Sequence, residues 1–397
     1  MLSAAFVATD FRSKAAVNRL SWAAPRNSGA ATGFYCWERC EHGTGLPVCG
    51  FPHGGPVKRV FQITLRSLLV AGLLAGGALA GAVAWARYGQ PPLTVRSGAF
   101  PEEVVYVRSA DDIVNAGMVF APPKSQAKPI AVIWLHGWGV NFYSPTYVMI
   151  GRALAERGLT TISVNTRMHD LGTVAGHRFG KRLRGGAYWG VTSEGSLDLA
   201  AWVTFAAKQG FERVVLVGHS AGWSAVAAYE IQSQDPRVAG MVLASGAVQV
   251  QRPERDAALM AQATRLVEAG SGDDLIRLPN KSFPSYMSAA TFLDLASVPP
   301  AVLDFFGLEV ETPGVASLRK PLLAFFGTRG DVGGPADLEI VRASVKKYAG
   351  GNTKAETIMI DRADHMYTGE EAQVAQVISE WIDRSVVASG TKGNVRP

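Results

Sequence analysis

A chain of 397 residues, of which 48% are hydrophobic and 9% aromatic, can form a large folded domain with extensions and is too apolar to be intrinsically disordered. The formal net charge is +6, and residues 1–66 account for +5 of it, since they hold eight Lys or Arg against three Asp or Glu. The rest of the chain is nearly neutral, so we expect no nucleic-acid partner.

The first 56 residues are rich in Gly, Ala and Pro and show no steady hydrophobic period, which predicts a disordered extension. Val57 directly precedes a basic pair, and a valine codon can act as a bacterial start, so we expect the true start there.

All three cysteines, Cys36, Cys40 and Cys49, lie in this extension, close to His42 and His53. Their spacing matches no common zinc-binding pattern, so we expect no metal site. The rest of the chain has no cysteine and is therefore compatible with any redox compartment.

Residues 57–87 have the features of a signal peptide or a transmembrane anchor. Twenty uncharged residues, 67–86, lie between Arg66 and Arg87, and at about 1.5 Å per residue a helix of this length spans the roughly 30 Å hydrocarbon core. The preceding basic residues predict a cytoplasmic N-terminus and export of the remainder. Small residues that suit signal cleavage leave two alternatives open, a membrane-anchored protein and a secreted or periplasmic one.

From residue 100 onward, strand and helix patterns alternate. Short apolar runs rich in β-branched residues predict strands, and amphipathic runs predict helices. The expected strands cover residues 103–108, 114–120, 130–135, 160–164, 214–217 and 238–244. The expected helices cover residues 144–157, 193–208 and 221–232, with a long loop after residue 164. Buried strands alternating with helices predict a mostly parallel sheet covered on both faces.

The alternation breaks between residues 250 and 320, where two further helices are expected, over residues 254–270 and 285–297. We interpret the insertion as a helical cap over the functional site, with an insertion packed elsewhere as the alternative. The alternation then resumes with strands 322–326 and 356–360 and helices 335–348 and 370–385. The main domain is expected to cover residues 100–388, followed by a flexible tail, 389–397.

Ser220 directly follows the strand that begins at residue 214, with Gly218 and Gly222 on either side. A sharp turn from strand to helix tolerates little side chain, and a serine there would be exposed as a nucleophile. A serine that caps the following helix is the alternative.

His365, the only histidine after Ser220, lies past the last expected strand and is the candidate base. Asp331, which follows the preceding strand, is the candidate acid that orients it. Asp361 and Asp364 are rivals by proximity, but they share the histidine's own loop.

The glycine-rich run of residues 135–139 ends an early strand. We expect the backbone N–H groups of Trp138 and Ala221 to bind a developing oxyanion and His136 to brace this loop.

Together, strand-HGxG, strand-GHSAG-helix, strand-Asp and loop-His resemble the α/β-hydrolase superfamily over roughly residues 100–388. The resemblance implies an eight-stranded, mostly parallel sheet, with Ser220 as nucleophile, His365 as base and Asp331 as acid. It implies a serine hydrolase acting on carboxylic esters through an acyl-enzyme, without metal or cofactor. Members often carry the acid three residues after the strand-end glycine, whereas Asp331 is four after Gly327.

The expected substrate is a small ester. Basic residues in the loop 177–190 would attract an anionic substrate or an anionic membrane surface, unless the loop is simply solvated. Aromatic residues in the insertion suit either an apolar pocket or core packing. These residues are Arg178, Lys181, Arg182 and Arg184 in the loop, and Phe292, Phe305 and Phe306 in the insertion.

Two other functions stay open. A peptidase of the same fold would need an acidic anchor for the substrate amine, for which Asp294 or Asp304 are candidates. A catalytically inactive scaffold is the second, although such proteins usually lose a catalytic residue and all three candidates are present here.

Overall fold

The computed structural model describes residues 98–178, 181–249, 255–279, 284–350 and 353–387. The N-terminal extension with its cysteines, the apolar segment 67–86 and the tail 389–397 lie outside the described residues. Within the described part, none of the helices combines the length and apolarity that a membrane span requires. All described residues fall in one compact unit, residues 92–397.

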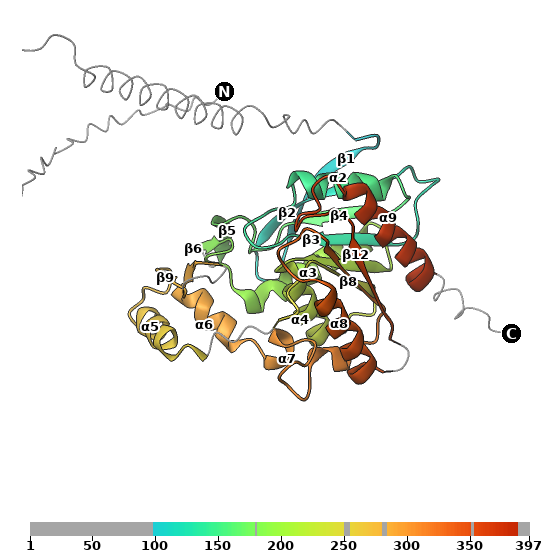
Figure 1. The fold of residues 1–397 in the computed structure, drawn as a ribbon. Helices are drawn as coiled ribbons and strands as arrows, with labels where there is room; N and C mark the ends of the chain where they lie inside the picture. The colour runs from blue at the N-terminus through green and yellow to red at the C-terminus, as the bar shows by residue number, and fades with distance from the viewer. Residues whose placement is uncertain (1–97, 179–180, 250–254, 280–283, 351–352, 388–397) are drawn as a thin grey trace, which may run out of the picture. The chain divides into compact units, whose positions relative to one another are not determined.

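An eight-stranded sheet forms the centre of this unit, in the order β1-β2-β4-β3-β7-β8-β11-β12 (Figure 1). The two β1–β2 and β2–β4 pairs are antiparallel and the remaining pairs are parallel, so the expected mostly parallel sheet is confirmed. The strands are β1 (Glu102–Arg108), β2 (Val114–Phe120), β3 (Ala131–Leu135), β4 (Thr160–Val164), β7 (Val214–His219), β8 (Val238–Ala244), β11 (Leu322–Gly327) and β12 (Ala355–Ile360).

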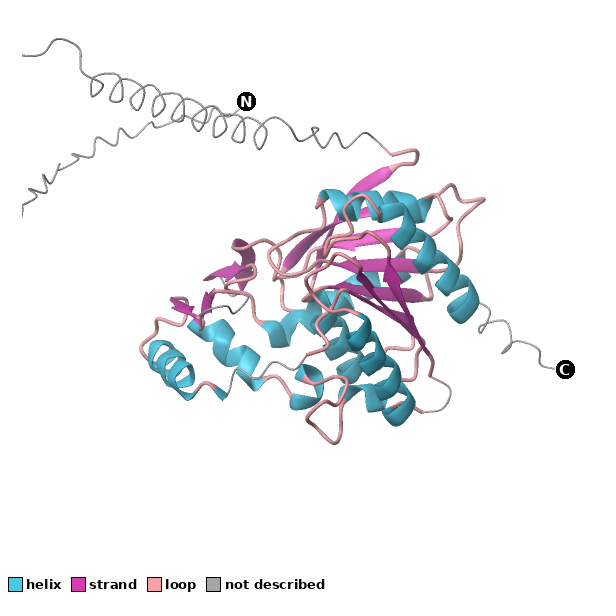
Figure 2. Ribbon diagram, in the orientation of Figure 1, coloured by secondary structure: helices cyan, strands magenta, loops and turns pink. Residues whose placement is uncertain are grey.

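Helices cover both faces of the sheet, as Figure 2 shows. One face packs against α3 (Gly195–Lys208), α4 (Gly222–Ser233) and α8 (Pro335–Tyr348), and the other against α2 (Pro145–Ala155) and α9 (Glu371–Trp381). Successive residues of β3 alternate between the two cores, because side chains along a strand point to opposite faces. Both faces being buried explains why the strands are continuous apolar runs.

Several expected bounds need correction. The long loop after β4 contains a hairpin, β5 (Thr173–Arg178) and β6 (Lys181–Gly185). The helix expected over residues 285–297 begins only at Ala289, as α6 (Ala289–Ser297). The residues before it form β10 (Tyr286–Ser288), which pairs with β9 (Leu275–Arg277). The pairing with β9 overrides the local helical pattern. The last helix, α9, ends at Trp381 and continues as a π-helix, Ile382–Val387.

The insertion between β8 and β11 packs in two places. Its first half, α5 (Ala257–Glu268) with α6, β9 and β10, has a small apolar core of its own. The Ser288 N–H donates to the Tyr188 carbonyl at 2.8 Å, which holds this half on the loop that follows β6. Its second half, with α7 (Pro300–Leu303), packs against α4. The insertion is therefore not purely helical, and its first half contacts the loop after β6.

Candidate active site

Ser220 lies on a sharp turn between β7 and α4. Its φ of +52° is in the left-handed region, which costs a residue other than glycine about 1–2 kcal/mol. The Ser220 N–H donates to the carbonyl of Ala244 at the end of β8, at 2.9 Å. The residue at the N-cap of α4 is Ala221, and no side chain caps this helix. The helix-capping alternative for Ser220 is therefore wrong, because its side chain does not cap the N-terminus of α4.

Both glycines around Ser220 are required sterically. A β-carbon on Gly218 would lie 2.6 Å from the Trp223 Cα, and one on Gly222 would lie 2.5 Å from the His136 carbonyl oxygen. Real β-carbon contacts are longer, so any side chain at either position would displace the backbone. Because α4 and the loop after β3 approach β7 so closely, only glycine fits at these two positions.

The loop after β3 is held against Ser220. A β-carbon on Gly137 would lie 2.9 Å from the Ser220 Cβ. His136 braces this loop as expected: its Nδ1–H donates to the Gly137 carbonyl at 2.7 Å, and its Nε2 accepts from the Thr166 N–H at 3.2 Å. Both bonds require the neutral imidazole, and burial lowers the pKa of His136 to about 4. Trp138 follows Gly137 directly and Ala221 follows Ser220, so the two expected oxyanion-binding residues belong to adjoining turns.

The loops after β11 and β12 run side by side. The Thr328 N–H donates to the Ile360 carbonyl and the Arg329 N–H to the Ala363 carbonyl, each at 2.9 Å. Gly327 has no room for a side chain, because the Ala363 carbonyl stands against it. These contacts bring the loop of Asp331 and the loop of His365 together, although 34 residues separate the two side chains in the sequence.

His365 is half-buried, and this burial lowers the pKa of its imidazole below the ordinary value, against the opposing influence of Asp331 and then Asp364. The imidazole is therefore neutral at neutral pH, as a proton acceptor must be. Its Nδ1 is buried, and no hydrogen-bond partner for it exists among the described residues. Asp331 is thus close enough to act on His365 electrostatically, but the carboxylate–imidazole hydrogen bond is not formed.

The three candidate aspartates have different surroundings. Asp331 is exposed. Gly330 is the third residue after Gly327. A β-carbon built on it would lie 3.6 Å from the His365 backbone nitrogen. Asp364 accepts the Thr368 N–H at 2.9 Å, so it caps its own loop. Asp361 is exposed and lies 4.0 Å from Arg362.

Two residues with no assigned role in the sequence analysis lie behind the site. Tyr147 of α2 and His219 of β7 are each 1% exposed and are joined by a 2.7 Å hydrogen bond. The rings of His219 and His365 are 4.9 Å apart between centroids. The His219 side chain is turned to Tyr147 and to the His365 loop, so it does not take the position of a base beside Ser220. Tyr147 carried no signal beyond its place in an amphipathic helix.

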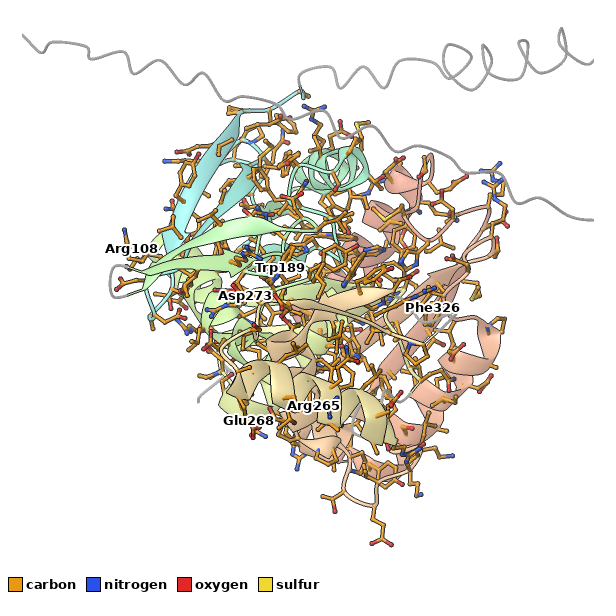
Figure 3. The ribbon with its side chains drawn as sticks, turned by 90° about the vertical axis from the view of Figure 1, so that its left-hand side faces the viewer. Arg108, Trp189, Arg265, Glu268, Asp273 and Phe326 are labelled. Carbon is orange, nitrogen blue, oxygen red and sulfur yellow. The ribbon has the colours of Figure 1, made fainter. Side chains whose placement is uncertain are left out.

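Aromatic rings border the loop after β3. Tyr188 contacts Trp138 edge-on with centroids 5.4 Å apart, and Trp189 contacts Tyr188 at 5.7 Å. The Trp189 indole donates to the Asp273 carbonyl of the insertion at 2.8 Å, and Figure 3 shows the two residues side by side. The insertion therefore reaches the neighbourhood of Trp138 through this aromatic group.

Most of the described residues that were expected to recognise substrate instead make contacts within the protein. Arg184 is exposed, but it lies 5.3 Å above the Trp189 ring and 3.7 Å from Asp273. The side chains of the other three basic residues are outside the described set. Phe305 and Phe306 are 4% and 1% exposed and pack against Trp223, while Phe292 lies in the small core of the insertion. Core packing is thus the correct reading of these phenylalanines, and the pocket reading is wrong.

Within the ranges that the structure describes, no group of three or more His, Cys, Asp or Glu side chains is arranged to hold a metal ion.

Comparison with known proteins gives one family and a set of similar folds. The sequence model of the alpha/beta hydrolase family matches residues 132–377. No curated protein matches the sequence.

Many solved structures share the fold. DcsB in complex with its substrate analogue is 16% identical, with 72% of this chain and 99% of that one covered and a TM-score of 0.53. The hypothetical protein PA2218 from Pseudomonas aeruginosa is 13% identical, with 74% and 96% covered and a TM-score of 0.53. Est1E from Butyrivibrio proteoclasticus with bound ferulic acid is 15% identical, with 71% and 99% covered and a TM-score of 0.49. For DcsB and PA2218, at these identities, the likeness concerns the fold alone.

Proposed function

Since this chain belongs to the alpha/beta hydrolase family, we propose that it is a serine hydrolase that cleaves carboxylic ester bonds through an acyl-enzyme intermediate. In this proposal Ser220 is the nucleophile, His365 the general base and Asp331 the acid that orients the base. The N–H groups of Trp138 and Ala221 form the oxyanion hole. No cofactor takes part.

One observation carries the proposal: Ser220 has a strained, left-handed backbone at the uncapped start of α4, in contact with the glycine-rich loop after β3. Strain of this kind persists only where the surrounding structure enforces it, and it concentrates at functional sites. The uncapped end of α4 leaves backbone N–H groups and the positive end of the helix dipole beside the serine. This is the environment that a developing oxyanion requires.

The proposed reaction has two steps. His365 takes the proton of the Ser220 hydroxyl while the oxygen attacks the ester carbonyl, and the carbonyl π electrons move to the oxygen to form the oxyanion. When the C=O bond reforms, the alcohol leaves with the proton from His365. Water then attacks the acyl-enzyme carbonyl while His365 takes its proton, and the serine oxygen leaves with that proton from His365, which releases the carboxylic acid and the free serine. The lowered pKa of His365 keeps its imidazole neutral and ready for the first transfer.

A fluorophosphonate probe tests the nucleophile directly, since it labels activated serines. Full-length wild-type protein should be labelled and the Ser220→Ala variant should not. Ser224→Ala is the matched control, because Ser224 is an exposed serine on the same helix and should leave labelling unchanged. Equal labelling of the wild type and the Ser220→Ala variant, or no labelling of either, would refute the assignment.

The hydrogen bonds of the two candidate anchors, Asp304 and Asp294, weaken the peptidase alternative. Asp304 is buried and accepts three backbone N–H groups, those of Leu308, Glu309 and Val310. Asp294 accepts both the N–H and the hydroxyl of Ser193. Both carboxylates are thus already engaged in hydrogen bonds within the chain. A panel of p-nitrophenyl esters and aminoacyl amides separates the two activities, and we expect turnover of the esters alone.

Export of the catalytic domain, with or without a retained anchor, belongs to the same proposal and rests on residues 57–87 alone. Cell fractionation with mass spectrometry of the mature N-terminus tests it. We expect the protein in the membrane fraction with that segment intact, or in the periplasm or medium without it. Recovery of the intact chain in the cytosol would refute it.

A further inference from the structure

A buried hydrogen-bonded chain links the loop after β3 to the loop of His365. The Gly137 N–H donates to the Tyr147 hydroxyl oxygen at 3.2 Å. Tyr147 is bonded to the His219 Nδ1 at 2.7 Å, and the His219 Nε2 is bonded to the His365 backbone carbonyl at 2.9 Å. The proposed mechanism uses neither Tyr147 nor the His219 side chain.

The direction of every bond in this chain follows from chemistry. A carbonyl oxygen only accepts, so the His219 Nε2 carries the proton and donates to His365. In a neutral imidazole the Nδ1 is then the acceptor, and the Tyr147 O–H donates to it. The same hydroxyl oxygen accepts from the Gly137 N–H. Burial lowers the pKa of His219 to about 3, which agrees with a permanently neutral ring.

The surrounding rings hold the His219 imidazole in one orientation. Trp134 stacks on it with a centroid distance of 6.4 Å and an interplanar angle of 19°. Tyr147 and Tyr367 contact it edge-on at 5.5 and 5.6 Å. A side chain packed in this way cannot exchange its partners without moving the core, so the two loops that it joins are fixed relative to each other.

We propose that Tyr147 and His219 are positioning residues that tie the oxyanion loop to the base loop through this hydrogen-bonded chain. Gly137 precedes the proposed oxyanion donor Trp138, and His365 is the proposed base, so the chain fixes the distance between the two halves of the site. The inference rests on the proposed function. Because misplacement of reacting groups by about 1 Å can lower a rate about a hundredfold, loss of the chain should reduce kcat with little effect on KM.

Two replacements of His219 separate positioning from mere filling of space. Gln places an amide nitrogen near the Nε2 position and can still donate to the His365 carbonyl, whereas Asn is too short to do so. We expect His219→Asn and Tyr147→Phe to lower kcat at least about tenfold with KM changed less than about twofold. His219→Gln should restore most of the lost activity.

Tyr229→Phe is the matched control for Tyr147→Phe. Tyr229 is also buried and donates its hydroxyl to Asp235 at 2.6 Å, but it lies outside the proposed site. It should lose thermal stability as Tyr147→Phe does, while its kcat should equal that of the wild type. Wild-type kcat in both Tyr147→Phe and His219→Asn, or an equal loss in Tyr229→Phe, would overturn the proposal.

A second measurement keeps the proposal testable if a His219 variant fails to fold. ¹⁵N NMR of the wild-type imidazoles, with the His219 signals assigned by their loss in His219→Gln or by through-bond correlation, should show a protonated Nε2 and an unprotonated Nδ1 from about pH 5 to about pH 8. The opposite tautomer would overturn the proposal. Failure of the proposed function appears separately, as absence of fluorophosphonate labelling of the wild type.

Discussion

Gly137 lies so close to Ser220 that a β-carbon on the glycine would be 2.9 Å from the Cβ of the serine. The two residues follow β3 and β7, which are neighbours in the sheet, so their loops meet at the carboxyl ends of parallel strands. Binding sites in open α/β sheets lie in this region. The loop after β3 is therefore part of the surroundings of Ser220. The spacing between Gly137 and Ser220 can be tested directly by substitution.

Gly137→Ala should lower kcat/KM about tenfold to a hundredfold while leaving the protein folded, because the added methyl group pushes the proposed oxyanion donor away from Ser220. Steady-state ester hydrolysis measures this. Gly195→Ala is the control, since a β-carbon there would lie at an ordinary 3.8 Å from the Ala225 Cβ. Equal kcat/KM in both variants would show that the loop does not contribute to the reaction.

Asp331→Asn should reduce kcat/KM by about a hundredfold or more, since the neutral imidazole loses the carboxylate that stabilises its protonated form. The Asp331 carboxylate raises the pKa of His365, so its removal should also move the acid limb of the kcat/KM profile to lower pH. A pH–rate profile of each variant measures both effects.

Asp364→Asn keeps an acceptor oxygen for the Thr368 N–H, so its kcat/KM should fall by less than about threefold. The reverse order of effects, with the larger loss in Asp364→Asn, would make Asp364 the acid and Asp331 a bystander.

The free energy of unfolding should fall as the pH drops below about 6.5. His136 and His219 have pKa values of about 4 and about 3 in the folded protein, against an ordinary 6.5. Between pH 6.5 and about pH 4, both histidines bind protons in the unfolded chain but not in the folded one. The stability is therefore full above pH 6.5 and decreases toward pH 4. Each histidine contributes about 1.4 kcal/mol per pH unit.

Urea denaturation measures this slope best between pH 6.5 and about 5, where unfolded Asp and Glu side chains are still ionised. An unfolding free energy that does not change over this interval would show that the two imidazoles are not held neutral.

Asp304→Asn should destabilise the fold by about 2 kcal/mol, because an amide group would face one of the three backbone N–H groups that the buried carboxylate accepts. Asp294→Asn, at a less buried position, should cost about 0.5 kcal/mol. Urea denaturation at neutral pH compares them. A loss of amidase activity in Asp304→Asn without a loss of stability would instead support the peptidase alternative.

Much of the architecture could be read from local patterns. The strand of residues 238–244 and the helix of residues 335–348 have the expected bounds, because a short buried apolar run and a helix starting at Pro335 carry their signals locally. The strand 286–288 differs from the expected helix because its pairing with residues 275–277 outweighs the helical pattern of its own sequence. The hairpin after β4 was missed because its glycine-rich, basic sequence has no strand alternation.

At the site, the sequence by itself marked Ser220, Asp331 and His365, because each follows a recognisable strand and has a side chain suited to one chemical role. Only the tertiary structure decided that the His365 Nδ1 has no hydrogen-bond partner among the described residues, Asp331 included, and that His219 and Tyr147 lie between two loops. Hydrophobic periodicity records which face of an element is buried. It holds no information on which distant polar groups meet there, and the residues that His219 joins are 72 and 146 positions away.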